Sequence, residues 1–224
     1  MAIANLFLLA TACMLIARQM ADQAGAFLRE HHEAPVNRWL RLTVIILFSV
    51  LVCILLSLRT ANELTPGDVI KIILLFTWGI PMVLLDLHCY WLPQRFTGGF
   101  WLSGLLLATV HDSRLSLFAA LYSSASVFVC LLIFRAAVNR LRREERMGLG
   151  DVHLIAGLAA WFGWPLACLM SAFAFFLLFL GAVICRRHVM PYAPWLFALM
   201  AGYAMVFPQL LSGDAYDFLF SLPR

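Results

Sequence analysis

Two aspartates at the ends of long apolar segments are the residues of this chain best suited to chemistry. Asp86 ends one apolar run, and Asp151 precedes another in the sequence Gly148-Leu149-Gly150-Asp151. An ionisable side chain at the edge of a membrane span is costly and by default marks a functional site. Two such acids at one membrane face would suit an aspartic protease that acts on a membrane-embedded substrate.

Two carboxylates in contact do not ionise together, so the pair shares one proton near neutral pH. The charged member can activate a water molecule as a general base, while the protonated member polarises the scissile carbonyl group. This chemistry requires neither a metal nor a cofactor. Which of Asp86 and Asp151 acts as the base is a property of the pair and stays open.

Both acids also have simpler structural interpretations. Asp151 could be the N-cap of a helix, a position that Asp favours, and Asp86 could cap its loop or pair with Arg95. Gly148 and Gly150 are expected to shape the site, because a residue without a side chain allows close approach to Asp151 and can adopt positive φ angles.

Composition places the chain in a membrane. Of its 224 residues, 63% are hydrophobic and 12% are charged, and the mean hydropathy is +0.90. A soluble domain carries about 25% charged residues. The net charge of +4 does not call for a nucleic-acid partner, because cytoplasmic loops of membrane proteins accumulate Lys and Arg. We expect a single membrane domain, residues 1–224, in contact with membrane lipids.

The apolar segments predict an all-α integral membrane protein, a polytopic bundle of about eight transmembrane helices. A span needs about 20 apolar residues, and the predicted segments are 2–18, 42–58, 69–86, 98–111, 115–135, 151–164, 165–185 and 192–211. The fourth and sixth are short, and they could be completed by neighbouring residues or could line a cavity rather than face lipid. The boundary between the sixth and seventh, at Gly163-Trp164-Pro165, is the weakest, because proline can also kink a continuous helix.

Basic residues predict the orientation. If residues 2–17 form an uncleaved first span that starts outside, twelve of the sixteen Lys and Arg residues lie inside, as the positive-inside rule expects. Asp86 and Asp151 then share the cytoplasmic face, and residues 19–41 form an inner loop. The basic run 135–146 is interpreted as a topology signal that contacts lipid headgroups, with substrate docking as the alternative.

The residues around both acids resemble the type IV prepilin peptidases, the GxGD-type membrane aspartic proteases of bacteria. Asp86 with the later Leu92-Pro93-Gln94-Arg95-Phe96-Thr97 is similar to the family's Asp followed by Leu-Pro-Asp-x-Leu-Thr. Residues 148–154 resemble Gly-x-Gly-Asp-x-Lys-Leu, and residues 156–164 resemble Ala-Ala-x-Gly-Ala-Trp-x-Gly-Trp. Residues 190–196 resemble Ile-Pro-Phe-Gly-Pro-Phe-Leu. The motif region extends from about residue 75 to 200.

The resemblance implies an endopeptidase of the bacterial inner membrane that removes the basic leader from type IV prepilins or pilin-like proteins, with Asp86 and Asp151 as catalytic residues. Gln94, His153 and Ala193 depart from the family pattern, but neither catalytic acid is lost. Many family members bind zinc through paired cysteines in the first cytoplasmic loop, and these are associated with N-methylation of the pilin. Residues 19–41 contain no cysteine, so S-adenosylmethionine would be a cofactor only if this chain also methylates.

Two other classes of function stay open. Membrane-edge carboxylates also serve proton-coupled transporters, although here no pair of interrupted helices repeats between the two halves. An inactive, peptidase-like scaffold for pilus assembly is the other class. A metal site at residues 31–33, which read His-His-Glu, lacks a further ligand at regular spacing. The particular pilin and the oligomeric state are left open.

Overall fold

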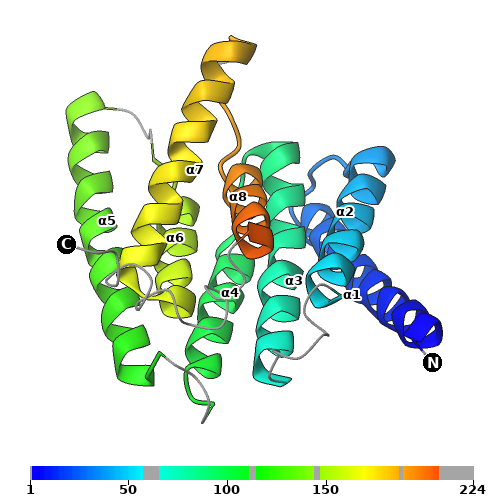
Figure 1. The fold of residues 1–224 in the computed structure, drawn as a ribbon. Helices are drawn as coiled ribbons and strands as arrows, with labels where there is room; N and C mark the ends of the chain where they lie inside the picture. Colours follow the sequence, from blue (N-terminus) through cyan, green and yellow to red (C-terminus); the bar gives the residue numbers. More distant parts are fainter. Residues whose placement is uncertain (1, 58–65, 111–114, 144–146, 187–188, 207–224) are drawn as a thin grey trace. The chain divides into compact units, whose positions relative to one another are not determined.

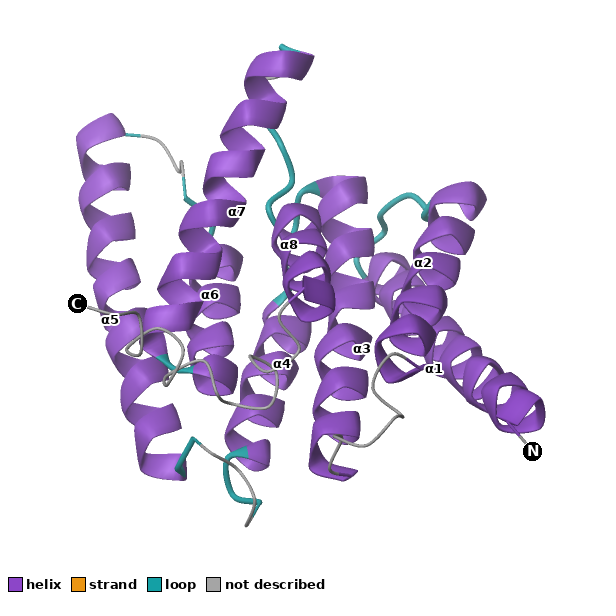
Figure 2. Cartoon of the chain, in the orientation of Figure 1, coloured by secondary structure: helices purple, strands orange, loops and turns teal. Residues whose placement is uncertain are grey.

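The regular structure of the chain is α-helical throughout the part that is described. The computed structural model describes residues 2–57, 66–110, 115–143, 147–186 and 189–206, and these ranges contain helices but no strands (Figure 2). The eight helices are α1 (Ala2–Glu30), α2 (Arg38–Ser57), α3 (Pro66–Cys89), α4 (Gln94–Leu107), α5 (Leu117–Arg142), α6 (Leu149–Phe162), α7 (Trp164–Cys185) and α8 (Ala193–Val206). The predicted all-α class and the number of helices are confirmed.

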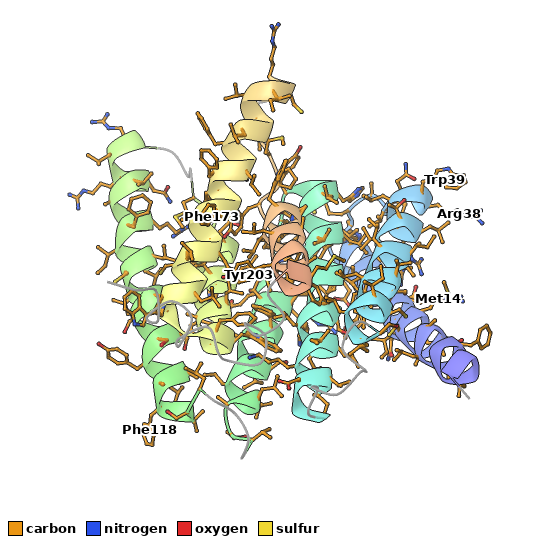
Figure 3. The ribbon with its side chains drawn as sticks, viewed as in Figure 1. Met14, Arg38, Trp39, Phe118, Phe173 and Tyr203 are labelled. Carbon is orange, nitrogen blue, oxygen red and sulfur yellow. The ribbon has the colours of Figure 1, made fainter. Side chains whose placement is uncertain are left out.

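Four helices in the described residues are long and apolar enough to cross a membrane. They are Arg38–Ser57, Gly67–Cys89, Leu117–Leu141 and Trp164–Cys185, within α2, α3, α5 and α7. Large apolar side chains such as Phe118, which is 84% exposed, and Phe173 project outward from these helices (Figure 3), as side chains in lipid do. The predicted span 2–18 begins among residues 1–6, whose side chains lie outside the description, and it stays a prediction.

The first of two compact units covers residues 1–91 and contains α1, α2 and α3. Each of these helices contacts the other two. On α2 the buried residues recur at helical spacing, from Val44 and Ile45 through Phe48 to Val52 and Leu55. This spacing gives α2 one apolar face for its neighbours.

The first helix continues well beyond its apolar part, so the prediction of a loop from residue 19 is wrong for residues 19–30. Ala17, Ala21, Ala24 and Leu28 are buried, and they are spaced by three or four residues. A polar segment with this spacing is amphipathic and buries one face as a helix. The polar residues from Arg18 onward therefore end the apolar stretch without ending the helix.

The second unit covers residues 92–224 and is organised around α6. Helix α6 lies between α4 and α5 and also contacts α7, which packs on α8 (Figure 1). Every residue from Val152 to Phe162 is buried, which is typical of a helix surrounded by protein. The short sixth segment is therefore surrounded by protein rather than exposed to lipid.

The backbone preferences of a glycine and a proline separate α6 from α7. Gly163 has φ 77 and ψ 162, a conformation that only glycine adopts readily. Helix α7 then begins at Trp164 with Pro165 in its first turn, where the missing N–H of proline leaves no hydrogen bond unmade. The sixth and seventh segments are therefore two separate helices rather than one kinked helix.

Trp161 of α6 makes a hydrogen bond and a ring contact with α4 in the core of this unit. Its Nε1 donates to the main-chain oxygen of Phe100 at 2.9 Å, and the two rings stack with centroids 5.4 Å apart. Gly104 leaves room for the indole, because a Cβ there would lie 2.7 Å from Trp161 Cδ1.

We expect Trp161→Phe to lower the free energy of unfolding by about 1–3 kcal/mol, because it removes a buried hydrogen bond and leaves a small void. Thermal unfolding of the purified protein in detergent would measure the loss. Trp164→Phe is the matched control, since Trp164 is 53% exposed and its substitution should change stability little. Equal melting temperatures for wild type and Trp161→Phe would contradict this role.

Candidate active site

Asp151 lies in the first turn of α6, three residues after the N-cap Gly148. The interpretation of Asp151 as the N-cap itself is therefore wrong. Its side chain is half-buried. The unpaired N–H groups at a helix start carry partial positive charge and favour a carboxylate in the first turn. The partial positive charge at the start of α6 therefore favours a negative charge on the Asp151 side chain.

Gly148 and Gly150 provide space rather than unusual backbone angles. Gly148 has φ −68, and Gly150 lies within α6, so the expectation of positive φ is wrong for both. A Cβ on Gly150 would lie 2.5 Å from the main-chain oxygen of Leu92 and 2.6 Å from its Cβ. A Cβ on Gly148 would lie 3.3 Å from Oδ2 of Asp151. Glycine at position 150 therefore permits the start of α6 to lie directly against Leu92.

His153 follows Asp151 on α6, at the position where the family pattern has lysine. It is buried, and its Nδ1 lies 2.8 Å from the main-chain oxygen of Leu149. The imidazole also lies beside the rings of Phe128 and Trp101, with centroid separations of 5.2 and 6.2 Å. His153 is therefore a packing residue where α4, α5 and α6 meet.

Tyr192, just before α8, brings a buried hydroxyl to the same unit. It is 4% exposed, and its ring stacks on that of Phe175 with centroids 4.4 Å apart. The hydroxyls of Tyr192 and Ser171 have no hydrogen-bond partner among the described residues. Tyr192 therefore places a buried hydroxyl, unpaired within the described residues, next to α7 and α8.

We expect Tyr192→Phe to raise stability by about 1 kcal/mol, because it keeps the stacked ring and removes a buried hydroxyl that has no partner in the described structure. Thermal unfolding in detergent is the measurement. Tyr122→Phe, at an exposed tyrosine, should leave the melting temperature unchanged. A lower melting temperature for Tyr192→Phe would mean that the hydroxyl makes a stabilising hydrogen bond.

Asp86 lies in the last turn of α3, in the first unit. Its side chain is 5% exposed, and its main-chain oxygen accepts a hydrogen bond from Tyr90 at 3.1 Å. Tyr90 has φ 56 and ends the helical course, and α4 starts directly after Pro93. The break between the two helices therefore covers only residues 90–93, because Gln94 to Thr97, which the sequence suggested as part of a turn, already form the first turn of α4.

The segment that follows Asp86 packs against the C-terminal end of α1 and the residues just after it. Trp91 contacts the rings of Phe27 and His31 edge-on, with centroids 5.0 and 5.1 Å apart. The Nε2 of His88 lies 2.9 Å from the main-chain oxygen of Ala34. These contacts were missed by sequence reasoning, which treated residues 19–41 as a loop. The alanines of α1 recur every three or four residues. This spacing could have predicted that the helix continues to Phe27 and the residues that contact Trp91.

Asp86 belongs to the first unit and Asp151 to the second, and the structure describes each acid within its own unit. Their pairing stays a prediction, whereas Gly148 and Gly150 do lie beside Asp151. No group of three or more His, Cys, Asp or Glu residues in the described ranges could hold a metal ion. Residues 31–33 therefore do not form the centre of such a group.

The chain matches known proteins over a range of residues that includes Asp86 and Asp151. The model of the type IV leader peptidase family matches residues 73–186, about half of the chain. The prepilin leader peptidase/N-methyltransferase of Aeromonas hydrophila is 31% identical over 169 residues, which are 72% of this chain and 56% of that protein. The type 4 prepilin-like proteins leader peptide-processing enzyme of Escherichia coli O78:H11 is 31% identical over 148 residues, 65% of this chain and 54% of that protein.

A shorter relative is matched over most of its length. The chain is 30% identical to the leader peptidase HopD of Escherichia coli over 149 residues, 63% of this chain and 90% of that protein. It spans just over half the length of the two longer relatives. No solved structure matches the chain. The family match and these relatives show that the chain belongs to the type IV leader peptidase family.

Proposed function

We propose that the chain is an aspartic endopeptidase that removes the basic leader peptide from type IV prepilins or pilin-like proteins. The observation that carries the proposal is that the family match includes both Asp86 and Asp151. Each acid lies in the end turn of an apolar helix, where a carboxyl group is costly without a function. The names of the three relatives support the substrate class.

The two acids are proposed to act as a pair. Covalent connectivity supports the pairing, because Leu92, which packs on Gly150, follows Asp86 by only six residues of chain, at most about 20 Å. With one proton shared, one acid takes a proton from water, and the water oxygen attacks the scissile carbonyl carbon. The other acid polarises the carbonyl oxygen through its proton. The first acid then passes the proton it took from water to the amide nitrogen, the C–N bond breaks, and the products are an amine and a carboxylic acid. This scheme needs no cofactor.

The site is proposed to lie at the cytoplasmic face of the bacterial inner membrane. In this orientation twelve of the sixteen Lys and Arg residues lie inside, in agreement with the positive-inside rule. The hydrophobic helix of the substrate would lie among lipids beside the apolar helices of the enzyme. The basic leader would then reach the acids at the interface.

Co-expression with a panel of candidate prepilins, followed by intact-mass measurement of each pilin, tests the activity. Loss of the leader from a pilin only when the chain is present supports the proposal. A panel that stays uncut while the chain is abundant in the membrane would overturn it. Uptake of a solute driven by a pH gradient would then favour a transporter.

The proposal does not include N-methylation. The Aeromonas relative carries that activity in its name, but this chain spans 56% of its length. HopD, of which 90% is covered, is named a leader peptidase alone. The same mass spectra test this point, because a methylated pilin N-terminus would be heavier by about 14 Da.

A further inference from the structure

Two side chains of α5 hold the peptide that leads into α6. The Nε of Arg135 donates to the main-chain oxygen of Met147 at 3.0 Å, and the main-chain N–H of Met147 donates to Oδ1 of Asn139 at 3.4 Å. Arg135 and Asn139 are four residues apart and lie on one face of α5. Both main-chain polar groups of Met147 are thus engaged by side chains of the neighbouring helix. We call this pair the Met147 clamp.

The N-cap residue of α6 makes no side-chain cap hydrogen bond. That residue is Gly148, which has no side chain, and Asp151 lies within the first turn. The first N–H groups of a helix have no intrahelical partner, so the position of this helix start depends on what holds the preceding peptide. Met147 is that peptide, and it precedes Asp151 by four residues, so the Met147 clamp holds the chain directly before the turn that carries Asp151.

Arg135 differs in its surroundings from the basic residues that follow it. Arg135 and Asn139 are half-buried, whereas Arg140 is exposed. The topology interpretation of residues 135–146 requires only positive charge at this end of α5. A lysine at position 135 would preserve the charge, but it would lose the planar guanidinium whose Nε–H donates to Met147. The charge interpretation and the clamp interpretation therefore predict different results for the same substitution.

We propose that Arg135 and Asn139 are positioning residues that hold Asp151 in its reactive orientation through the Met147 peptide. This rests on the proposed peptidase function. Neither side chain takes part in proton transfer, so their removal weakens catalysis only through the placement of the acid. A displacement of about 1 Å at a catalytic group can cost about 100-fold in rate.

Steady-state kinetics of prepilin cleavage provide the first test. Arg135→Lys and Asn139→Leu each remove one hydrogen bond of the Met147 clamp, and we expect kcat to fall about 10- to 100-fold while KM changes less than about twofold. Asn139→Asp keeps an acceptor oxygen and should retain most of the wild-type kcat. Arg140→Ala removes an exposed charge five residues after Arg135 and should leave both constants unchanged.

Three kinetic results would overturn the proposal. They are a wild-type kcat in both Arg135→Lys and Asn139→Leu, an equal loss in Arg140→Ala, or a rise in KM at constant kcat. The last result would identify Arg135 as a docking residue for the substrate instead.

Hydrogen exchange separates a failure of this proposal from a failure of the proposed function. Peptides that cover residues 147–154 should exchange faster in Arg135→Lys and Asn139→Leu than in wild type or Arg140→Ala, whether or not any prepilin is cut. If wild type cleaves nothing, the peptidase proposal falls and faster exchange still supports the structural part of the Met147 clamp. Exchange that is unchanged in both variants would overturn the clamp.

Discussion

Asp86→Asn and Asp151→Asn should each slow prepilin cleavage by about 10²- to 10⁴-fold or more, the largest effect expected from any substitution in this chain. Asparagine keeps the size of aspartate, but it can neither accept a proton from water nor hold the proton that a carboxyl pair shares. Initial rates with purified protein and a synthetic leader–pilin substrate would measure the loss. Intact mass of the co-expressed pilin would show it in cells.

Asp22→Asn is the matched control for these two variants. Asp22 is an exposed residue of α1 that pairs with Arg41, and an exposed ion pair contributes little to stability. This variant should cleave at the wild-type rate. A wild-type rate for Asp86→Asn or Asp151→Asn, at equal amounts of inserted protein, would remove that acid from the mechanism. Loss in only one of the two would contradict the pair.

Gly150→Ala is expected to have the second-largest effect. The added Cβ would lie 2.5 Å from the main-chain oxygen of Leu92, so either Leu92 or the start of α6 has to move. Overpacking of this kind costs about 1–3 kcal/mol. Because Asp151 is the next residue, we also expect cleavage to slow by about 100-fold. Thermal unfolding and initial rates would measure the two effects.

Gly98→Ala provides a control of opposite sign. Gly98 lies inside α4, and a Cβ there meets nothing within 4 Å. Alanine is favoured over glycine within a helix by about 0.5–1 kcal/mol, so this variant should be more stable than wild type and fully active. A Gly150→Ala protein as stable and as active as Gly98→Ala would show that the contact with Leu92 is not required.

Helices were predictable wherever apolar character or backbone chemistry marks them. The sixth and seventh helices separate at Gly163 and Pro165, whose conformational preferences are local. The extension of α1 was not visible in hydropathy, because the apolar stretch ends at Arg18 while the helix continues to Glu30. Its stability comes from an alanine-rich face packed on α2 and α3, and that partner surface is absent from the local sequence.

The sequence motifs indicated candidate site residues but not the geometry around them. Motif spacing predicted roles for the two acids and the adjacent glycines, but neither glycine adopts the positive φ that the sequence analysis allowed for. The contact of Gly150 with Leu92 joins distant parts of the sequence, and only the fold brings them together. Arg135 and Asn139 appear in sequence as part of a basic run. Their hydrogen bonds to Met147 depend on the register of α5 against the start of α6.

Helix α6 is too short to span the hydrocarbon layer by itself. This length affects how the protein is assembled in the membrane. Its 14 residues span about 21 Å, less than the roughly 30 Å of the hydrocarbon layer. It is buried by α4, α5 and α7, and α7 leaves the ribosome after it. We therefore expect α6 to remain beside the translocation channel until α7 is made. The turn that carries Asp151 would then reach its final surroundings late, and proteolytic activity would begin only after synthesis of this helix bundle.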